Sequence, residues 1–179
     1  MKLIITDIKD FKIPVLGEHK IIKPDGAIKH CIGCFGCWIK TPGECIIKDG
    51  FDKTGCHMGR CDELIMISEC LYGGFSEFVK KVQDRAISYV RGDFNIVDNE
   101  MRHRQRYFNK IKITALFYGE NITEGEKYTA EKIVKANAKN FYAKVEKVLF
   151  YRLDDGKDFI DIPEMTELIQ NIDVEEMFK

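Results

Sequence analysis

The chain has 179 residues, of which 45% are hydrophobic and 32% charged, and its formal net charge is -1. A chain of this length builds one domain with a substantial core, and its near-neutral charge gives no electrostatic field to recruit nucleic acid or an anionic membrane. No apolar run approaches the roughly 20 residues that span a bilayer, and the first residues read as a strand rather than a signal peptide, so we expect a cytoplasmic protein.

Apolar runs and turn residues predict the elements of the first half. Leu3 to Ile8 is a β-branched apolar run that predicts a strand, and His19 to Ile22 predicts a second one. Residues 45–62 are weakly helical at best, because three glycines each cost about 1 kcal/mol in a helix. The continuous apolar run Leu64 to Ser68 is typical of a strand buried on both faces, and Ser76 to Val90 predicts a helix with Ser76 as its N-cap.

The second half repeats the alternation of strand and helix. Arg91 to Asn109 is polar, and we expect it to be an excursion outside the core. Ile111 to Tyr118 predicts another buried strand, Gly119 to Gly125 a loop, Glu126 to Lys144 a helix, and Val145 to Tyr151 a final strand. This order predicts an α/β domain with an open parallel sheet, in which ligands bind beyond the carboxyl ends of the strands.

The domain is expected to cover residues 1–151. Residues 152–179 form an acidic tail, in which Pro163 predicts the start of a short helix from Glu164 to Asn171.

Four of the seven cysteines lie within fifteen residues, at the spacing C-x2-C-x2-C-x7-C: Cys31, Cys34, Cys37 and Cys45. In a reducing compartment such thiols are free, metal-bound or catalytic. They could each ligate a [4Fe–4S] cluster, or exchange electrons through a reversible disulfide. The alternative is structural, because the first three would share one face of a helix as small core residues. The remaining cysteines lack ligand spacing, and we expect them to pack: Cys56, Cys61 and Cys70.

A second cluster is basic. Arg102, His103, Arg104 and Arg106 fall within five residues and are followed by Tyr107. They could form an anion site with a stacking ring, but a solvated arm or a subunit contact is the expected role, because charge runs are usually solvated.

Three stretches together resemble the flavodoxin-like NAD(P)H-dependent FMN reductases, especially their iron–sulfur flavoprotein branch. The run Cys31 to Cys45 is similar to that branch's compact cysteine motif. Ser68-Glu-Cys-Leu-Tyr-Gly-Gly74 is similar to the family's Ser-Pro-x-Tyr-x-Gly-Gly loop after the third strand. Phe78-Val-Lys-Lys-Val-Gln-Asp84-Arg85 is similar to its Leu-Lys-x-x-x-Asp-Arg helix.

The chain departs from this family at two places. The residues before Cys31 contain no Gly-Ser-Pro-Arg-type phosphate loop and have no room for the helix that follows it, so the N-terminal βα unit is shortened. In the loop, Glu69 stands where the family has proline and Leu71 where it has an aromatic residue.

The resemblance implies a three-layer flavodoxin-like fold and an FMN-dependent NAD(P)H oxidoreductase or electron-transfer flavoprotein. The flavin carries the chemistry in such proteins, so no catalytic side chain is expected. The resemblance also implies a nicotinamide donor, a small electron acceptor, a [4Fe–4S] cluster on the four cysteines and a homo-oligomer. FMN would lie against the loop residues Ser68, Glu69, Cys70, Leu71, Tyr72, Gly73 and Gly74. The alternative function is a flavodoxin-like scaffold that has lost flavin binding and acts as a binding or assembly protein.

Overall fold

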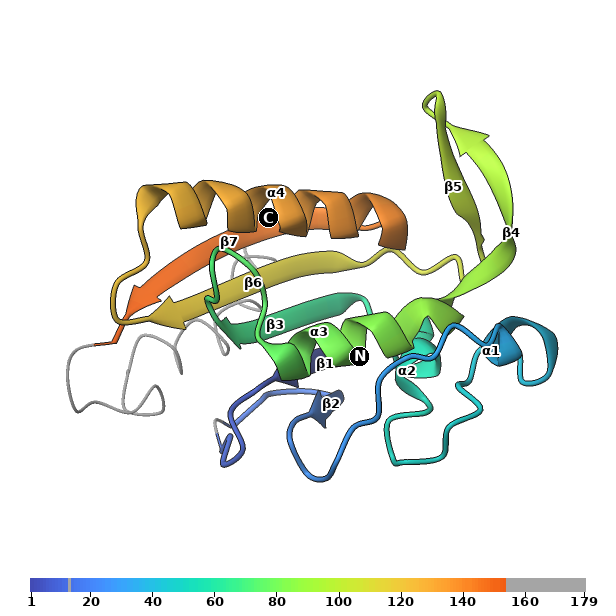
Figure 1. The fold of residues 1–179 in the computed structure, drawn as a ribbon, viewed down its shortest axis with the longest axis horizontal. Helices are drawn as coiled ribbons and strands as arrows, with labels where there is room; N and C mark the ends of the chain where they lie inside the picture. The colour runs from blue at the N-terminus through green and yellow to red at the C-terminus, as the bar shows by residue number, and fades with distance from the viewer. Residues whose placement is uncertain (13, 154–179) are drawn as a thin grey trace.

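The chain folds around a central parallel sheet. The computed structural model describes residues 1–12 and 14–153. Its sheet strands are β1 (Lys2–Thr6), β2 (His19–Ile22), β3 (Glu63–Glu69), β6 (Lys112–Gly119) and β7 (Lys144–Arg152). They run parallel in the order β2-β1-β3-β6-β7, as Figure 1 shows. This is the strand order of the doubly wound flavodoxin-like sheet, so the predicted fold class is confirmed.

Two long helices, α3 (Glu77–Arg85) and α4 (Glu124–Phe141), lie over one face of the sheet (Figure 1). Ser76 caps α3, because its hydroxyl accepts a hydrogen bond from the amide of Val79 at 3.5 Å. Thr123 and Glu126 form a reciprocal capping box that starts α4 two residues earlier than predicted. A short 3₁₀ helix, η1 (Ala86–Tyr89), continues α3.

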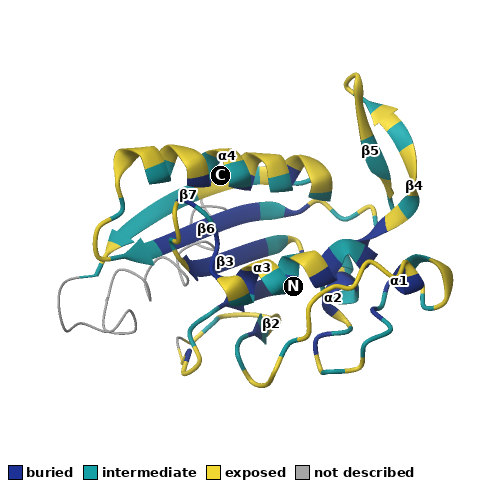
Figure 2. Cartoon of the chain, viewed as in Figure 1, coloured by how far each residue is buried: buried dark blue, intermediate teal, exposed yellow. Residues whose placement is uncertain are grey.

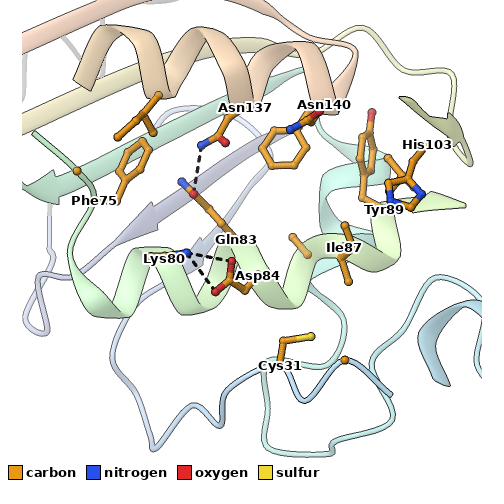
Figure 3. Close-up of a pocket in the computed structure, with 16 residues that line it drawn as sticks. Cys31, Phe75, Lys80, Gln83, Asp84, Ile87, Tyr89, His103, Asn137 and Asn140 are labelled. Atoms are coloured by element: carbon orange, nitrogen blue, oxygen red, sulfur yellow. Dashed lines mark hydrogen bonds and ion pairs between the residues drawn. The ribbon is translucent and has the colours of Figure 1, made fainter. Parts of the chain in front are cut away.

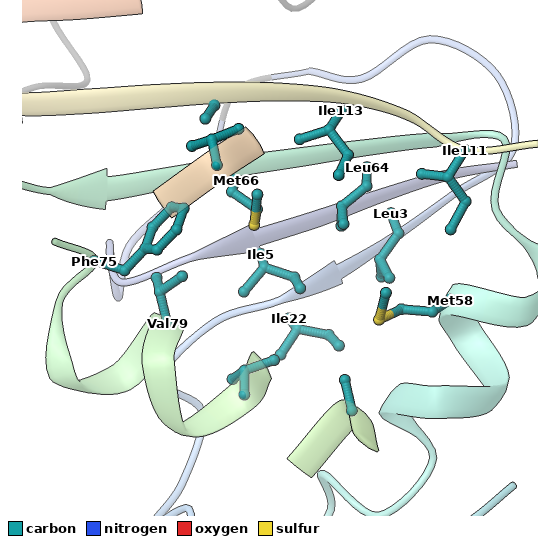
Figure 4. Close-up of a cluster of buried hydrophobic side chains, with 14 of the residues drawn as sticks. Leu3, Ile5, Ile22, Met58, Leu64, Met66, Phe75, Val79, Ile111 and Ile113 are labelled. Carbon is teal, nitrogen blue, oxygen red and sulfur yellow. The ribbon is translucent and has the colours of Figure 1, made fainter. Parts of the chain in front are cut away.

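The strands bury side chains on both faces, as their continuous apolar runs predict. Alternate residues such as Leu3, Leu64 and Met66 pack beneath the helices in the larger core cluster (Figure 4). Their neighbours on the opposite face, among them Ile4 and Ile65, form a smaller cluster with Phe11, which belongs to the β1–β2 connection. Figure 2 shows the central strands as almost entirely buried.

The connection between β1 and β2, residues 7–18, contains no helix in its described part. The shortening of the first βα unit relative to the family stays a prediction. No described helix is long and apolar enough to cross a bilayer. The helix predicted after Pro163 lies outside the described residues.

Helix α2 (Thr54–Arg60) was not predicted, because its sequence contains Gly55 and Gly59. A Cβ on Gly55 would lie 2.8 Å from the backbone nitrogen of Tyr89 in η1 and would meet Ser88 even more closely. Close packing against η1 thus requires glycine and outweighs its poor helix propensity.

The polar excursion is a projecting hairpin of β4 (Val90–Val97) and β5 (Glu100–Gln105), which stands away from the main sheet in Figure 1. Its turn residues Asp98 and Asn99 both have positive φ, at 52° and 60°. That geometry favours a tight two-residue hairpin turn, a signal that the sequence prediction missed.

Candidate functional site

The carboxyl edge of the sheet is acidic between β1 and β3, where the strand order changes direction. The Asp7 carboxylate follows β1 and accepts hydrogen bonds from the Tyr118 hydroxyl at 2.8 Å and the Glu69 amide at 2.9 Å. Burial, together with the Asp7 charge, raises the pKa of Tyr118, so its hydroxyl stays a neutral donor. Glu69 itself is exposed, so two carboxylates, those of Asp7 and Glu69, lie at this place between β1 and β3, which we call the switch point.

The loop after β3 closes in a tight turn at Leu71–Gly74. The amide of each end residue donates to the carbonyl of the other, at 3.0 and 2.8 Å. The central residues Tyr72 and Gly73 have positive φ, at 52° and 76°. A Cβ on Gly73 would lie 2.7 Å from Thr129 Cβ of α4. Both the backbone angle and the contact with α4 therefore require glycine at this position.

The predicted flavin-binding residues differ in accessibility. Ser68 is fully buried, and its hydroxyl donates to the Glu69 carbonyl and accepts from the Ser76 amide. The Cys70 amide donates to the Tyr118 carbonyl at 2.8 Å. Tyr72, in contrast, is 93% exposed. The loop therefore uses most of its amides to hold its own shape, and its role in flavin binding stays a prediction.

A groove of about 920 Å³ lies between α3 and α4 (Figure 3). It runs from Gly74, in the predicted flavin loop, to Cys31, in the predicted cysteine site. The volume lies within the range of small-molecule sites. Its other lining residues are Gly33, Phe75, Lys80, Gln83, Asp84, Ala86, Ile87, Tyr89, Val90, His103, Ile133, Asn137, Asn140 and Phe141.

The groove combines aromatic walls with neutral polar groups. The Asn137 amide donates to Gln83 Oε1 at 3.3 Å across the groove, as Figure 3 shows. Lys80 and Asp84 form an ion pair at 3.3 Å on the rim of the groove, so together they leave no net charge there. Carboxamides both donate and accept hydrogen bonds. The lining therefore suits an uncharged planar molecule with donors and acceptors along one edge.

His103 brings the hairpin to the rim of the groove. Its ring packs against Phe94 at 4.3 Å and against Trp38 at 4.9 Å between centroids. Its Nδ1 lies 2.8 Å from the Arg91 carbonyl, which can only accept a hydrogen bond. Nδ1 is thus the donor, and Nε2 is the nitrogen left for another partner.

The four clustered cysteines line a second, smaller cavity of about 120 Å³ that adjoins the groove through Cys31, Gly33 and Ile87. Cys31 and Cys34 are exposed, whereas Cys37 and Cys45 are buried. Burial raises the pKa of the Cys37 thiol, and its three clustered neighbours add to the shift.

The structure does not support the cluster prediction, and it agrees with the packing alternative only for Cys37, which is buried on a short helix. Within residues 1–12 and 14–153, no three His, Cys, Asp or Glu side chains are arranged to hold a metal ion, so the geometry gives no support to the [4Fe–4S] site. The helical packing alternative is wrong for Cys31 and Cys34, because helix α1 (Gly36–Ile39) starts only after them and they are exposed. Phe35, with φ 57°, is the N-cap residue of α1.

Arg85 ties the cysteine segment to α3, and sequence reasoning missed this role. Its side chain is fully buried, forms a two-point ion pair with Asp49 at 2.8 and 3.1 Å, and donates to the carbonyls of Lys29 and Ile47. Burial alone would raise the pKa of Asp49, but Arg85 and the amides of Lys29 and Phe51 lower it to about 2.

The basic stretch does not form an anion site in the described structure. Arg102 pairs with Glu100 and Asp98, and Arg104 pairs with Asp93. Arg106 donates to backbone carbonyls. Arg102 and Arg104 are thus paired with carboxylates along the hairpin, as expected for a solvated arm.

Comparison with known proteins identifies a fold but no family. No protein-family model and no curated protein matches the sequence. An azoreductase from Bacillus anthracis str. Sterne matches with a TM-score of 0.52 at 12% identity, over 98% of this chain and 96% of that one. An FMN-dependent NADH-azoreductase from Bacillus anthracis str. Ames Ancestor, in complex with FMN, matches with a TM-score of 0.51 at the same identity and coverage. At this identity the likeness shows the flavodoxin-like fold alone.

Proposed function

We propose that the protein is a flavin-dependent oxidoreductase that takes electrons from a nicotinamide donor and passes them to a small acceptor. The observation that carries this proposal is the groove between α3 and α4, because one cavity joins Gly74 of the predicted flavin loop to Cys31 of the predicted redox thiols. The FMN-dependent NADH-azoreductase among the solved structures of similar fold is consistent with it.

The lining of the groove supports the proposal of a flavin ring at this place. Phe75, Tyr89 and Phe141 give it aromatic walls. Gln83 and Asn137 hydrogen-bond to each other across the groove, so their carboxamides would have to exchange this bond for bonds to the N–H and carbonyl groups of an isoalloxazine edge. A bound flavin would accept a hydride and release electrons, so the side chains need only bind, orient and shield it. Exposed Lys80, Asp84 and Asn140 mark the side from which a donor or acceptor would approach.

The part of the carboxyl edge between β1 and β3 does not fit the phosphate of FMN. Asp7 and Glu69 place negative charge there, and the described part of residues 7–18 offers no helix N-terminus to hold an anion. We therefore assign no step to a phosphate contact. An iron–sulfur cluster is the finer expectation from the sequence, and with no supporting thiol arrangement we assign no step to it either.

Filling the groove should weaken flavin binding. We expect Asn137→Trp to weaken flavin binding by about tenfold or more, because the indole would occupy the space between α3 and α4. The matched control is Ala136→Trp, which adds the same side chain at the neighbouring exposed position of α4. Quenching of flavin fluorescence measures the affinity.

The visible absorption spectrum of anaerobically purified protein shows whether a flavin is bound. We expect the absorption bands of a flavin without the broad absorption of an iron–sulfur cluster. Colourless protein that also fails to bind added flavin would leave the alternative function, a binding or assembly scaffold. That alternative is favoured by the acidic switch point at Asp7 and Glu69.

We further propose that the protein is a homo-oligomer that associates through the β4–β5 hairpin. Within the described part of the chain its strands pair only with each other, and a lone two-stranded ribbon is marginally stable in water. Ile96 and Met101 pair across the ribbon and are 77% and 75% exposed. Ile96→Asp is expected to convert a dimer to a monomer, whereas Tyr128→Asp, at an exposed site on α4, should not. Light scattering after size exclusion measures the mass, and a monomeric unmodified protein contradicts the proposal.

A further inference from the structure

We propose that Cys31 and Cys34 form a reversible disulfide, which takes two electrons from the flavin and passes them to a small disulfide substrate. The inference rests on the proposed flavin function and names its acceptor. The spacing of the four clustered cysteines is typical of metal ligands, but within the described residues no three thiols are arranged to hold a metal ion. A redox pair requires only two of them.

Two of the four thiols can react with a molecule from solution. Cys31 and Cys34 are exposed, and both are free in the structure. Cys37 and Cys45 are buried. Thiol–disulfide exchange requires a thiolate to reach the sulfur that it attacks, so access decides which thiols take part. The exposed pair is therefore the one open to an external disulfide.

The exposed pair has the spacing and the room to close a bond. Cys31 and Cys34 enclose two residues, which is the C-x-x-C spacing of many redox-active pairs. Both line the smaller cavity, whose volume of about 120 Å³ equals that of about four water molecules. A disulfide needs a Cα–Cα separation of about 4.4–6.8 Å. Gly33, between the two, has φ 62° and a Cβ there would meet nothing within 4 Å, so this backbone has space to adjust.

Cys31 connects the pair to the groove. Among the four clustered thiols, Cys31 alone lines both the groove and the smaller cavity, whereas Cys34 lines the smaller cavity only. This placement gives the two sulfurs different roles, because Cys31 lies toward the flavin and Cys34 is left to meet the substrate. Ile32 and Phe35, beside them, are 68% and 58% exposed, so the approach is apolar and favours an uncharged disulfide.

The reaction balances in atoms and electrons. The Cys34 thiolate attacks one substrate sulfur, which forms a mixed disulfide and releases the first substrate thiolate. The Cys31 thiolate then attacks the Cys34 sulfur, which forms the Cys31–Cys34 disulfide and releases the second. The substrate thiolates take up the two protons that the cysteine thiols lost. Two electrons from the flavin and two protons restore both cysteine thiols. The nicotinamide donor supplies these electrons and one proton as a hydride, and water supplies the other proton.

A redox titration without flavin tests the disulfide itself. The protein is equilibrated with mixtures of reduced and oxidised dithiothreitol, and its free thiols are alkylated under denaturing conditions. Tryptic cleavage after Lys29 and Lys40 gives a peptide that contains three of the four cysteines. In the oxidised protein this peptide should carry the label on Cys37 alone. Cys34→Ser should remove the bond, whereas the control Cys56→Ser, outside the smaller cavity, should keep it.

Turnover of the flavin-loaded protein tests the path of the electrons. With NADH as donor and bis(2-hydroxyethyl) disulfide as substrate, Cys31→Ser and Cys34→Ser should each lower the rate of disulfide reduction by about tenfold or more. Cys31→Ser should stop at the mixed disulfide, which mass spectrometry detects on Cys34. The control Cys56→Ser should retain the rate.

The outcomes separate the inference from the function on which it rests. A disulfide between Cys31 and Cys34, with turnover that needs both thiols, supports the inference. A flavin-binding protein overturns it, and leaves the flavin function standing, if the bond is absent, if Cys34→Ser keeps its rate, or if elemental analysis finds iron or zinc on these thiols. A protein that forms the disulfide but binds no flavin overturns both.

Discussion

Replacing Arg85 with methionine is expected to lower the free energy of unfolding by about 3–5 kcal/mol, because it leaves the Asp49 carboxylate buried without its partner. The carbonyls of Lys29 and Ile47 also lose their donors. Such a loss is a large part of the about 5–15 kcal/mol that stabilises a typical domain. Urea unfolding measures it.

The matched control for Arg85→Met is Lys80→Met on the same helix. Lys80 pairs with Asp84 on the exposed surface, so its loss should cost about 0.5 kcal/mol or less. A second readout is acid stability. The pKa of Asp49 is about 2 in the folded protein, below the about 3.9 of an unfolded aspartate, so its contribution is present above about pH 4 and is lost as the pH falls toward 2. If Arg85→Met lowered the free energy of unfolding as little as Lys80→Met does, the stabilising role of the buried Arg85–Asp49 pair would be contradicted.

Substituting alanine for Gly73 is expected to cost about 2–4 kcal/mol, the sum of a left-handed backbone and a close contact. The added methyl group would lie 2.7 Å from Thr129 Cβ and 2.8 Å from the Glu126 carbonyl oxygen, so the turn would have to move away from α4. Because Gly74 lines the groove, this movement should also weaken flavin binding. Thermal or urea unfolding and flavin titration measure the two effects.

The control for Gly73→Ala is Gly17→Ala. Gly17 has nearly the same φ, 79° against 76°, but a Cβ there meets nothing within 4 Å. Gly17→Ala should therefore lower the free energy of unfolding only through the left-handed backbone, by about 1–2 kcal/mol, and leave flavin binding intact. Equal effects of the two variants would show that contact with α4 is unimportant.

The strands of the sheet could be predicted because their apolar runs are local. The run around Leu64 and the run around Ile113 both become central strands, since side chains on both faces must be buried in a parallel sheet. Helix α2 escaped prediction because Gly55 serves a contact with η1, and nothing in the local sequence signals that contact.

The candidate site was predictable only in part. The sequence motifs point to the loop at Gly74 and to the cysteines at Cys31, and both line one groove. The position of the Asp7 carboxylate could not be predicted from the sequence, because its hydrogen-bond donors belong to Glu69 and Tyr118, which are 62 and 111 residues away. The groove itself depends on the spacing between α3 and α4, which no local pattern encodes.

The Arg85 contacts also constrain the order of folding. The guanidinium group joins α3 to Ile47, Asp49 and Lys29, across 38, 36 and 56 residues of chain. Closing such loops costs entropy that only the finished contacts repay, so we expect the order of the cysteine segment to depend on the docking of α3. We therefore expect the segment and the groove rim to open as one cooperative unit. Exposure of the Cys37 and Cys45 thiols is in this way coupled to the docking of a helix distant in sequence.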